Sequence, residues 1–264
     1  MGRVEGKVAL ITGAAGGLGA ADARALAREG ARVVLADLAL APAEALAREI
    51  GGGARAVALD VRDEAAWAAL MAGVKAREGR LDVLVNNAGV VRPGTPEDVT
   101  EDDLRLILDV SINGTIWGCK HGLALMRETG GGSIINMASI TAIQGHPRSA
   151  AYTAAKGAVD AYTRAVAVHC AQLGLAIRCN VLLPDRIDTP MVRSMATATA
   201  QMNPALADNG PDKPDNSLGS VEDVANLVVF LASDESRFIS GQSFVIDNTA
   251  SITKGLVPPR RMDG

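Results

Sequence analysis

The stretch Thr12-Gly13-Ala14-Ala15-Gly16-Gly17-Leu18-Gly19 decides the fold of this chain. It directly follows the apolar run Val8 to Ile11 and opens into a segment with helical spacing that is expected to start near Ala20. Glycines at this point let the backbone turn tightly and approach a pyrophosphate, whose charge is stabilised by the N–H groups and dipole of the helix start. A P-loop would place Lys after its last glycine, which this stretch does not do. We predict that the turn binds a dinucleotide through Gly13, Gly16, Gly17, Leu18 and Gly19; a purely structural corner is the alternative.

Short apolar runs alternate with longer helical segments along the whole chain. The runs predict strands at Val8 to Ile11, Arg32 to Ala36, Ala54 to Leu59, Val83 to Val85, Ser133 to Met137, Ala176 to Leu182 and Ser243 to Ile246. The spacing predicts helices at Ala20 to Arg28, Pro42 to Ile50, Glu64 to Arg77, Asp102 to Met126, Ala151 to Leu173 and Val221 to Ala232. Continuous apolar strands are buried on both faces, and helical crossovers connect parallel strands. The expected fold is therefore α/β: a doubly wound Rossmann fold with a mostly parallel seven-stranded sheet flanked by helices.

The chain lacks a linker or an internal repeat, so residues 1–264 are expected to form a single domain. One irregular stretch, at about 184–220, contains five prolines, and such a long loop in a compact domain is usually a functional lid or mobile. Met191, Met195 and Met202 in this stretch have spacing compatible with one helical face, which would suit an apolar ligand. Ordinary packing of the methionines against the body of the domain is the alternative.

Composition excludes several classes of protein. Among 264 residues, 48% are hydrophobic and 21% charged, and 26 basic against 30 acidic residues are scattered, which argues against a nucleic-acid or anionic-membrane partner. Three cysteines are too few for a disulfide framework, and the N-terminal apolar run is too short for a signal or a membrane span, so a cytoplasmic location is expected. The three histidines have no ligand spacing, so no metal site is predicted.

A carboxylate ends the second predicted strand. Asp37 stands 37 − 19 = 18 residues after Gly19, close to the spacing expected of a carboxylate that binds ribose hydroxyls. A 2′-phosphate would meet like charge there, and neither Ala15 nor Leu38 is basic. The position therefore predicts NAD over NADP, with a solvated strand-end Asp as the alternative.

Candidate catalytic residues follow two later strands. Tyr152 and Lys156 are spaced i, i+4 at the start of a predicted helix, which places both groups on one face, and an ammonium favours a neighbouring phenolate. Ser139 closes the fifth strand, where its hydroxyl could orient a substrate oxygen. Asn113 lies inside a predicted helix, where a side-chain amide is not an obvious core choice. Each residue also has a structural interpretation as a cap, a buried bridge or part of a solvated face.

Together, the glycine turn, Asn86-Asn87-Ala88-Gly89, Ser139, Tyr152 and Lys156 resemble the short-chain dehydrogenase/reductase family over essentially the entire chain. The resemblance implies that Tyr152 is the general acid/base, that Lys156 lowers its pKa and holds the ribose, that Ser139 positions the substrate oxygen, and that Asn113 holds a water in the proton relay. It also implies cofactor contacts at Asp60, Val61, Asn87, Ala88, Gly89, Ile187 and Thr189.

Two stretches depart from the usual family pattern: Pro184-Asp185 and Asp247-Asn248-Thr249 stand where glycines are common. With Gly131 to Ser139, they look like a bacterial 3β/17β-hydroxysteroid dehydrogenase branch. If position 185 needs a left-handed conformation, Asp is among the residues that tolerate it.

The function expected from these residues is NAD-dependent oxidation and reduction between a secondary alcohol and a ketone, on a hydroxysteroid or other apolar alicyclic compound. A 3-oxoacyl-carrier-protein ketoreductase and a non-catalytic NAD-binding sensor are the alternatives. Resemblance to the family also implies a homo-oligomer, usually a tetramer.

Overall fold

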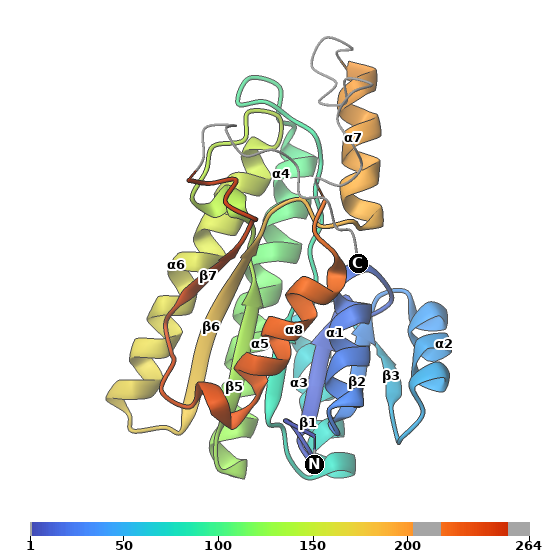
Figure 1. Ribbon diagram of the computed structural model, residues 1–264, viewed down its shortest axis with the longest axis vertical. Coiled ribbons are helices and arrows are strands. Elements are labelled where there is room, and N and C mark those ends of the chain that lie inside the picture. Colours follow the sequence, from blue (N-terminus) through green and yellow to red (C-terminus); the bar gives the residue numbers. More distant parts are fainter. Residues whose placement is uncertain (1, 203–217, 253–264) are drawn as a thin grey trace.

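The computed structural model describes residues 2–202 and 218–252 and has one seven-stranded sheet between two layers of helices (Figure 1). The strands are β1 (Val8–Thr12), β2 (Arg32–Asp37), β3 (Arg55–Ala58), β4 (Val83–Asn86), β5 (Gly132–Met137), β6 (Ile177–Pro184) and β7 (Ser243–Ile246). Their order is β3-β2-β1-β4-β5-β6-β7, and every pairing within this sheet is parallel. The predicted doubly wound α/β fold is confirmed.

The helices are α1 (Gly17–Arg28), α2 (Leu40–Ile50), α3 (Glu64–Glu78), α4 (Glu101–Leu108), α5 (Gly114–Thr129), α6 (Ala150–Gln172), α7 (Pro190–Met202) and α8 (Val221–Ala232). Local chemistry accounts for several of their ends. The Asp63 side chain caps the start of α3, and Ser220 and Asp223 form a reciprocal capping box at the start of α8. Gly79 and Gly130 end α3 and α5 with left-handed backbones.

Three predicted boundaries differ from the structure. Helix α1 begins at Gly17 instead of near Ala20, because the last part of the glycine stretch already forms its first turn. The predicted helix from Asp102 to Met126 is divided into α4, a π-helical segment η1 (Asp109–Asn113) and α5. The stretch predicted to be irregular from residue 184 contains α7, and the part at 203–217 lies outside the described residues.

Side chains along the central strands point alternately toward the two helix layers. Ala9 and Ile11 of β1 pack with α1, α2 and α8, whereas Val8 and Leu10 pack with α3, α5 and α6. Because both faces are covered, all five residues of β1 are buried. Within the described residues, no helix is both long and apolar enough to cross a membrane.

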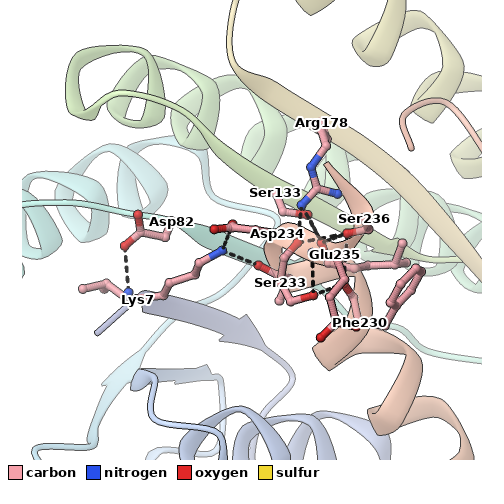
Figure 2. A network of polar contacts seen from close by, with 12 residues as sticks. Lys7, Asp82, Ser133, Arg178, Phe230, Ser233, Asp234, Glu235 and Ser236 are labelled. Carbon is pink, nitrogen blue, oxygen red and sulfur yellow. Dashed lines mark hydrogen bonds and ion pairs between the residues drawn. The ribbon is translucent and has the colours of Figure 1, made fainter. Parts of the chain in front are cut away.

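Polar side chains close the edge of the sheet where the strands begin (Figure 2). Backbone carbonyls at the C-terminal end of α8 accept hydrogen bonds from five side chains of the described residues, those of Lys7, Ser133, Arg178, Ser233 and Ser236. Two of these donors are cations, which also interact favourably with the negative end of the helix dipole. This amino edge is occupied by structural contacts, so a ligand site is expected at the opposite, carboxyl edge.

Candidate active site

The glycine turn at the end of β1 is held by the asparagine that directly follows β4. The side-chain amide of Asn87 donates to the carbonyls of Thr12 and Gly13, at 3.0 and 3.2 Å. A Cβ on Gly19 would come 2.3 Å from the Gly13 carbonyl oxygen and 2.6 Å from Asn87 Nδ2. No side chain caps the start of α1 at Gly16. The turn therefore presents uncapped backbone N–H groups at a helix start, an arrangement that suits a phosphate.

The hydroxyl of Thr12 extends this junction. It accepts from the backbone N–H groups of Asn87 and Ala88, at 3.1 and 3.0 Å, and is almost fully buried. Gly89 follows directly, and a Cβ there would lie 3.4 Å from Lys156 Nζ. The predicted residues Asn87, Ala88 and Gly89 thus connect the glycine turn to the predicted catalytic lysine.

Asp37 is hydrogen-bonded to the same turn. Its carboxylate accepts from the backbone N–H groups of Ala15 and Ala39, each at 2.8 Å. The side chain is half-buried at the end of β2, beside the turn. Its negative charge is therefore fixed where the sequence predicts a ribose-binding carboxylate.

The carboxylate of Asp60 is paired with Arg62. The Arg62 guanidinium reaches it at 2.6 to 3.1 Å, and this hydrogen bonding lowers the pKa of Asp60. Val61 is buried, and a Cβ added to Gly114 would come 2.9 Å from its side chain. The predicted cofactor contacts Asp60 and Val61 thus lie in a loop that packs against the start of α5, and Arg62 orients the Asp60 carboxylate.

Tyr152, Lys156 and Ser139 come together as predicted. The hydroxyls of Tyr152 and Ser139 are hydrogen-bonded, and Lys156 Nζ lies 5.5 Å from the centre of the Tyr152 ring. Lys156 Nζ donates to the carbonyl of Met137 at 2.6 Å. Ser139 follows β5 directly and accepts from the Thr141 N–H at 3.2 Å, which orients its hydroxyl.

The resemblance implies that Lys156 lowers the pKa of Tyr152, but in the structure the pKa of Tyr152 is raised. Burial raises the pKa of Tyr152 to about 12, the Ser139 hydrogen bond lowers it only in part, and burial lowers the pKa of Lys156 to about 8. The ammonium is directed to Met137 and lies over the ring, not at the phenolic oxygen. The chain alone therefore keeps Tyr152 protonated near neutral pH, and a further positive charge is needed to make it a base.

Asn113 lies at the end of η1, and its amide donates to Asp109 Oδ1 at 2.8 Å. The negative charge of Asp109 also acts on Arg62, in the loop that carries Asp60. The amide is thus engaged within its own segment, and its role in a proton relay stays a prediction.

The residues after β6 reach back to the glycine turn. Ile187 is buried and pairs with Gly219, and the methyl group of Thr189 would lie 3.7 Å from a Cβ on Gly17. Thr189 is itself nearly buried. Both predicted residues therefore border the turn, although about 170 residues separate them from it in the sequence.

The two departures from the family pattern have different consequences. Asp185 does not adopt a positive φ, so its backbone needs no left-handed conformation, and its N–H donates to Ile246 at 2.9 Å. Asn248 and Thr249 do adopt positive φ, 45° and 73°, which is unfavourable for a β-branched residue. The Asp247 carboxylate accepts from the N–H groups of Thr249 and Ser251, at 3.0 and 2.7 Å, and supports this strained turn.

Comparison with known proteins agrees with this geometry. Residues 13–249 match the sequence profile described as Enoyl-(Acyl carrier protein) reductase. The chain is 41% identical over 247 residues to 3-beta-hydroxysteroid dehydrogenase of Comamonas testosteroni, covering 94% of this chain and 96% of that one. The chain belongs to the short-chain dehydrogenase/reductase family.

Other members of the family are also similar. NADP-dependent (R)-specific alcohol dehydrogenase of Lentilactobacillus kefiri is 37% identical, with 93% of this chain and 96% of that one covered. A short-chain dehydrogenase/reductase crystal structure from Burkholderia xenovorans superposes with a TM-score of 0.86 at 36% identity, covering 96% and 99% of the two chains. This short-chain dehydrogenase/reductase is therefore an oxidoreductase related to hydroxysteroid and alcohol dehydrogenases.

Gly19 lies so close to Gly13 and Asn87 that a side chain at this position is expected to be harmful. Gly19→Ala is expected to lower the free energy of unfolding by about 2 kcal/mol and to weaken dinucleotide binding at least 10-fold, because the added methyl group pushes Asn87 and the turn apart. Chemical unfolding and calorimetric titration with NAD measure both effects. Gly16→Ala is the control for stability, because Gly16 has an extended backbone and its Cβ would meet no atom within 4 Å. Equal destabilisation by both substitutions would contradict the packing argument.

The lowered pKa of Lys156 predicts a pH-dependent stability. The unfolded chain binds more protons than the folded chain between pH 8 and 10.5, so the destabilisation from this charge is complete below pH 8 and is lost by 10.5. The stability of wild type relative to Lys156→Met should therefore rise by about 3 kcal/mol across that range, measured by urea unfolding. Lys120→Met, at an exposed lysine, should show no such change. A pH-independent difference for Lys156→Met would count against the buried ammonium.

Proposed function

We propose that this protein is an NAD-dependent oxidoreductase that interconverts a secondary alcohol and a ketone. The observation that carries the proposal is the Tyr152–Ser139 hydrogen bond, with Lys156 one helical turn further on, beside the glycine turn. This arrangement brings a proton donor/acceptor and a group that can bind a carbonyl oxygen to one point of the sheet edge.

In alcohol oxidation, Ser139 donates a hydrogen bond to the substrate oxygen and Tyr152 accepts the hydroxyl proton. The dinucleotide, when bound, supplies the hydride acceptor and a positive ring. The carbinol C–H bond breaks with its electron pair, the O–H proton passes to Tyr152 Oη, and a ketone forms. Lys156 would bind the ribose of a bound dinucleotide and would hold its positive charge over the Tyr152 ring. In ketone reduction, Tyr152 returns the proton.

The residues present fit a dinucleotide. A Cβ at Gly19 would fill the space between the turn and Asn87, and the start of α1 has uncapped N–H groups. The Asp37 carboxylate beside this turn supports NAD, since a 2′-phosphate would meet its negative charge. One relative is NADP-dependent, so the preference for NAD over NADP is tested by experiment below.

An apolar substrate is supported by the side chains near Ser139 and on α7. Ile143 follows the short 3₁₀ helix after Ser139 and is 54% exposed, and Met191 on α7 is 38% exposed. Exposed apolar side chains near a site suit an apolar ligand. With the 3-beta-hydroxysteroid dehydrogenase relative, they support a hydroxysteroid or another alicyclic alcohol as the substrate.

We also propose a homo-oligomer, a tetramer as in related proteins, located in the cytoplasm. Phe238 is fully exposed, and Val168 of α6, Leu173 directly after α6 and Val245 of β7 are each more than 40% exposed. Exposed apolar side chains of this kind are typical of a protein–protein contact. The three free, buried cysteines support a reducing compartment.

The general acid/base role of Tyr152 is tested by Tyr152→Phe. The substitution removes the proton acceptor and should lower kcat by about 10²–10⁴-fold, while the Kd for NAD changes less than 3-fold. Turnover is followed as NADH absorbance on a panel of hydroxysteroids, cyclic alcohols and 3-hydroxyacyl thioesters. Tyr162→Phe, at the chain's other tyrosine, is the matched control. Undiminished turnover by Tyr152→Phe would refute the assignment, and turnover of thioesters alone would favour the carrier-protein reductase.

The cofactor preference is tested at Asp37. Wild type should bind NAD at least 10-fold more tightly than NADP, and Asp37→Asn should reduce this ratio, because the uncharged amide repels a 2′-phosphate less. Calorimetric titration with both dinucleotides measures the ratio. Tighter binding of NADP by wild type would show that the carboxylate does not select the cofactor.

A further inference from the structure

Helix α1 buries a carboxyl group that the proposed reaction does not use. The Asp22 side chain is 0% exposed, and neither of its oxygens has a hydrogen-bond partner among residues 2–202 and 218–252. An ionised carboxylate in a protein interior needs a paired charge, hydrogen-bond donors or a metal. Within the same residues, no group of three His, Cys, Asp or Glu side chains could hold a metal ion. The surroundings of Asp22 therefore suit a neutral, protonated carboxyl group.

Asp22 lies in the middle of the buried face of α1. Leu18 and Leu26, four residues before and after it on the same face, pack in the apolar cluster that α1 shares with α8. Val224 and Val228 of α8 belong to this cluster, and the two helices lie side by side on the sheet (Figure 1). Because an ionised carboxylate would have to be hydrated, its formation would favour a separation of α1 from α8.

The charged side chains around α1 do not compensate a charge on Asp22. Strand β1 has none, and Arg24 and Arg28 of α1 itself are exposed. The helices and strands packed against α1 also carry Glu222 and Asp223 of α8, Arg32 and Asp37 of β2, and Glu44, Arg48 and Glu49 of α2. All of these are exposed except Asp37, which is bonded to the backbone of Ala15 and Ala39. The loop after β6, which borders the glycine turn, carries Asp185, Arg186 and Asp188. Burial is the cause that raises the pKa of Asp22 well above its usual range, without a contribution from any charge of the described residues.

The carboxyl group is close to the start of α1. Asp22 follows Gly19 by three residues and Gly17 by five, which corresponds to about 5 to 8 Å along the helix axis, and its side chain leans toward that end. A negative charge on Asp22 would repel an anion bound at the uncapped N–H groups. For two unit charges about 10 Å apart at an effective dielectric constant of about 20, this repulsion changes Kd by about 10-fold. Protonation of Asp22 and binding of a dinucleotide therefore favour each other.

We propose that Asp22 is a proton-operated switch of the dinucleotide site. When its carboxyl group is protonated, α1 packs against α8 and the glycine turn binds the dinucleotide. When the carboxyl group is ionised at alkaline pH, the contact between α1 and α8 loosens and binding weakens. A dinucleotide that binds the ionised protein is accompanied by one proton, which passes from solvent to Asp22. The effect on binding rests on the proposed function, whereas the effect on packing does not.

Unfolding of the protein without a dinucleotide tests the buried acid. Between the unfolded pKa of about 4 and the raised folded pKa, the folded chain keeps the proton that the unfolded chain has released, so stability falls as pH rises. The urea-unfolding equilibrium constant of wild type relative to Asp22→Asn should rise about 10-fold per pH unit between about pH 5 and 7, because the amide has the same shape and does not ionise.

Two further variants complete the unfolding experiment. Asp22→Ala, which suits the alanine-rich α1, should give the same pH trend as Asp22→Asn even if the amide disturbs packing. Glu222→Gln, at an exposed carboxylate of α8, is the control and should give a ratio that does not change with pH. A pH-independent ratio for both Asp22 variants would overturn the proposal.

Calorimetric titration tests the switch, with NAD or NADP, whichever binds wild type more tightly. The Kd of wild type divided by that of Asp22→Asn should lie within about 3-fold of one at pH 6 and should rise at least 10-fold by pH 9.5, beyond the pKa of about 8 to 9 that buried carboxyl groups reach. The ratio removes the titration of Lys156 and Tyr152, which both proteins share.

The two experiments separate the possible failures. A flat Kd ratio, with the pH-dependent unfolding present, would refute the switch and leave the proposed function intact. Failure of both proteins to bind either dinucleotide would refute the proposed function and the effect on binding, while the unfolding result would still decide whether Asp22 is a buried acid.

Discussion

Parallel pairing of all seven strands is the constraint on which the site depends. It brings the carboxyl ends of the strands to one edge, where the glycine turn after β1, Asp37 of β2 and Ser139 after β5 are found. The chain reverses direction in the sheet order between β1 and β4, and the crossover helices separate there. Asn87 occupies this point and bonds the turn, so the same topology that opens a binding site also supports its backbone.

Burial at this edge has opposite consequences for its two titratable groups. It raises the pKa of Tyr152 to about 12 and lowers that of Lys156 to about 8, so each group is driven toward its neutral form. The chain alone therefore holds a poor base, and the basicity of the phenol must depend on added positive charge. In the proposed reaction, this couples proton transfer to the presence of an oxidised dinucleotide, which limits unproductive chemistry in the free protein.

The π-helical segment shows how a small change of backbone hydrogen bonding alters a site. Widening the helix by one residue per turn rotates the side chains of η1 relative to a continuous α-helix. Asn113 then bonds Asp109, and the Ser111 side chain is buried. A regular helix over the predicted range from Asp102 to Met126 would present different side chains to the apolar cluster that contains Tyr152.

The sequence by itself determined the alternation of strands and helices, the glycine turn and the Tyr152, Lys156 and Ser139 set, because these depend on local periodicity and on residue types at short spacing. Tertiary structure alone decided that Asn87 holds the turn, that Thr189 lies beside Gly17 and that Asp37 is bonded to Ala15, since these contacts join segments 22 or more residues apart through the order of the strands. It also decided the π segment, because five residues are too few to show a hydrophobic spacing of their own within a longer helical pattern. Local rules thus specify which groups are present, and the packing of the sheet and helices specifies which of them meet.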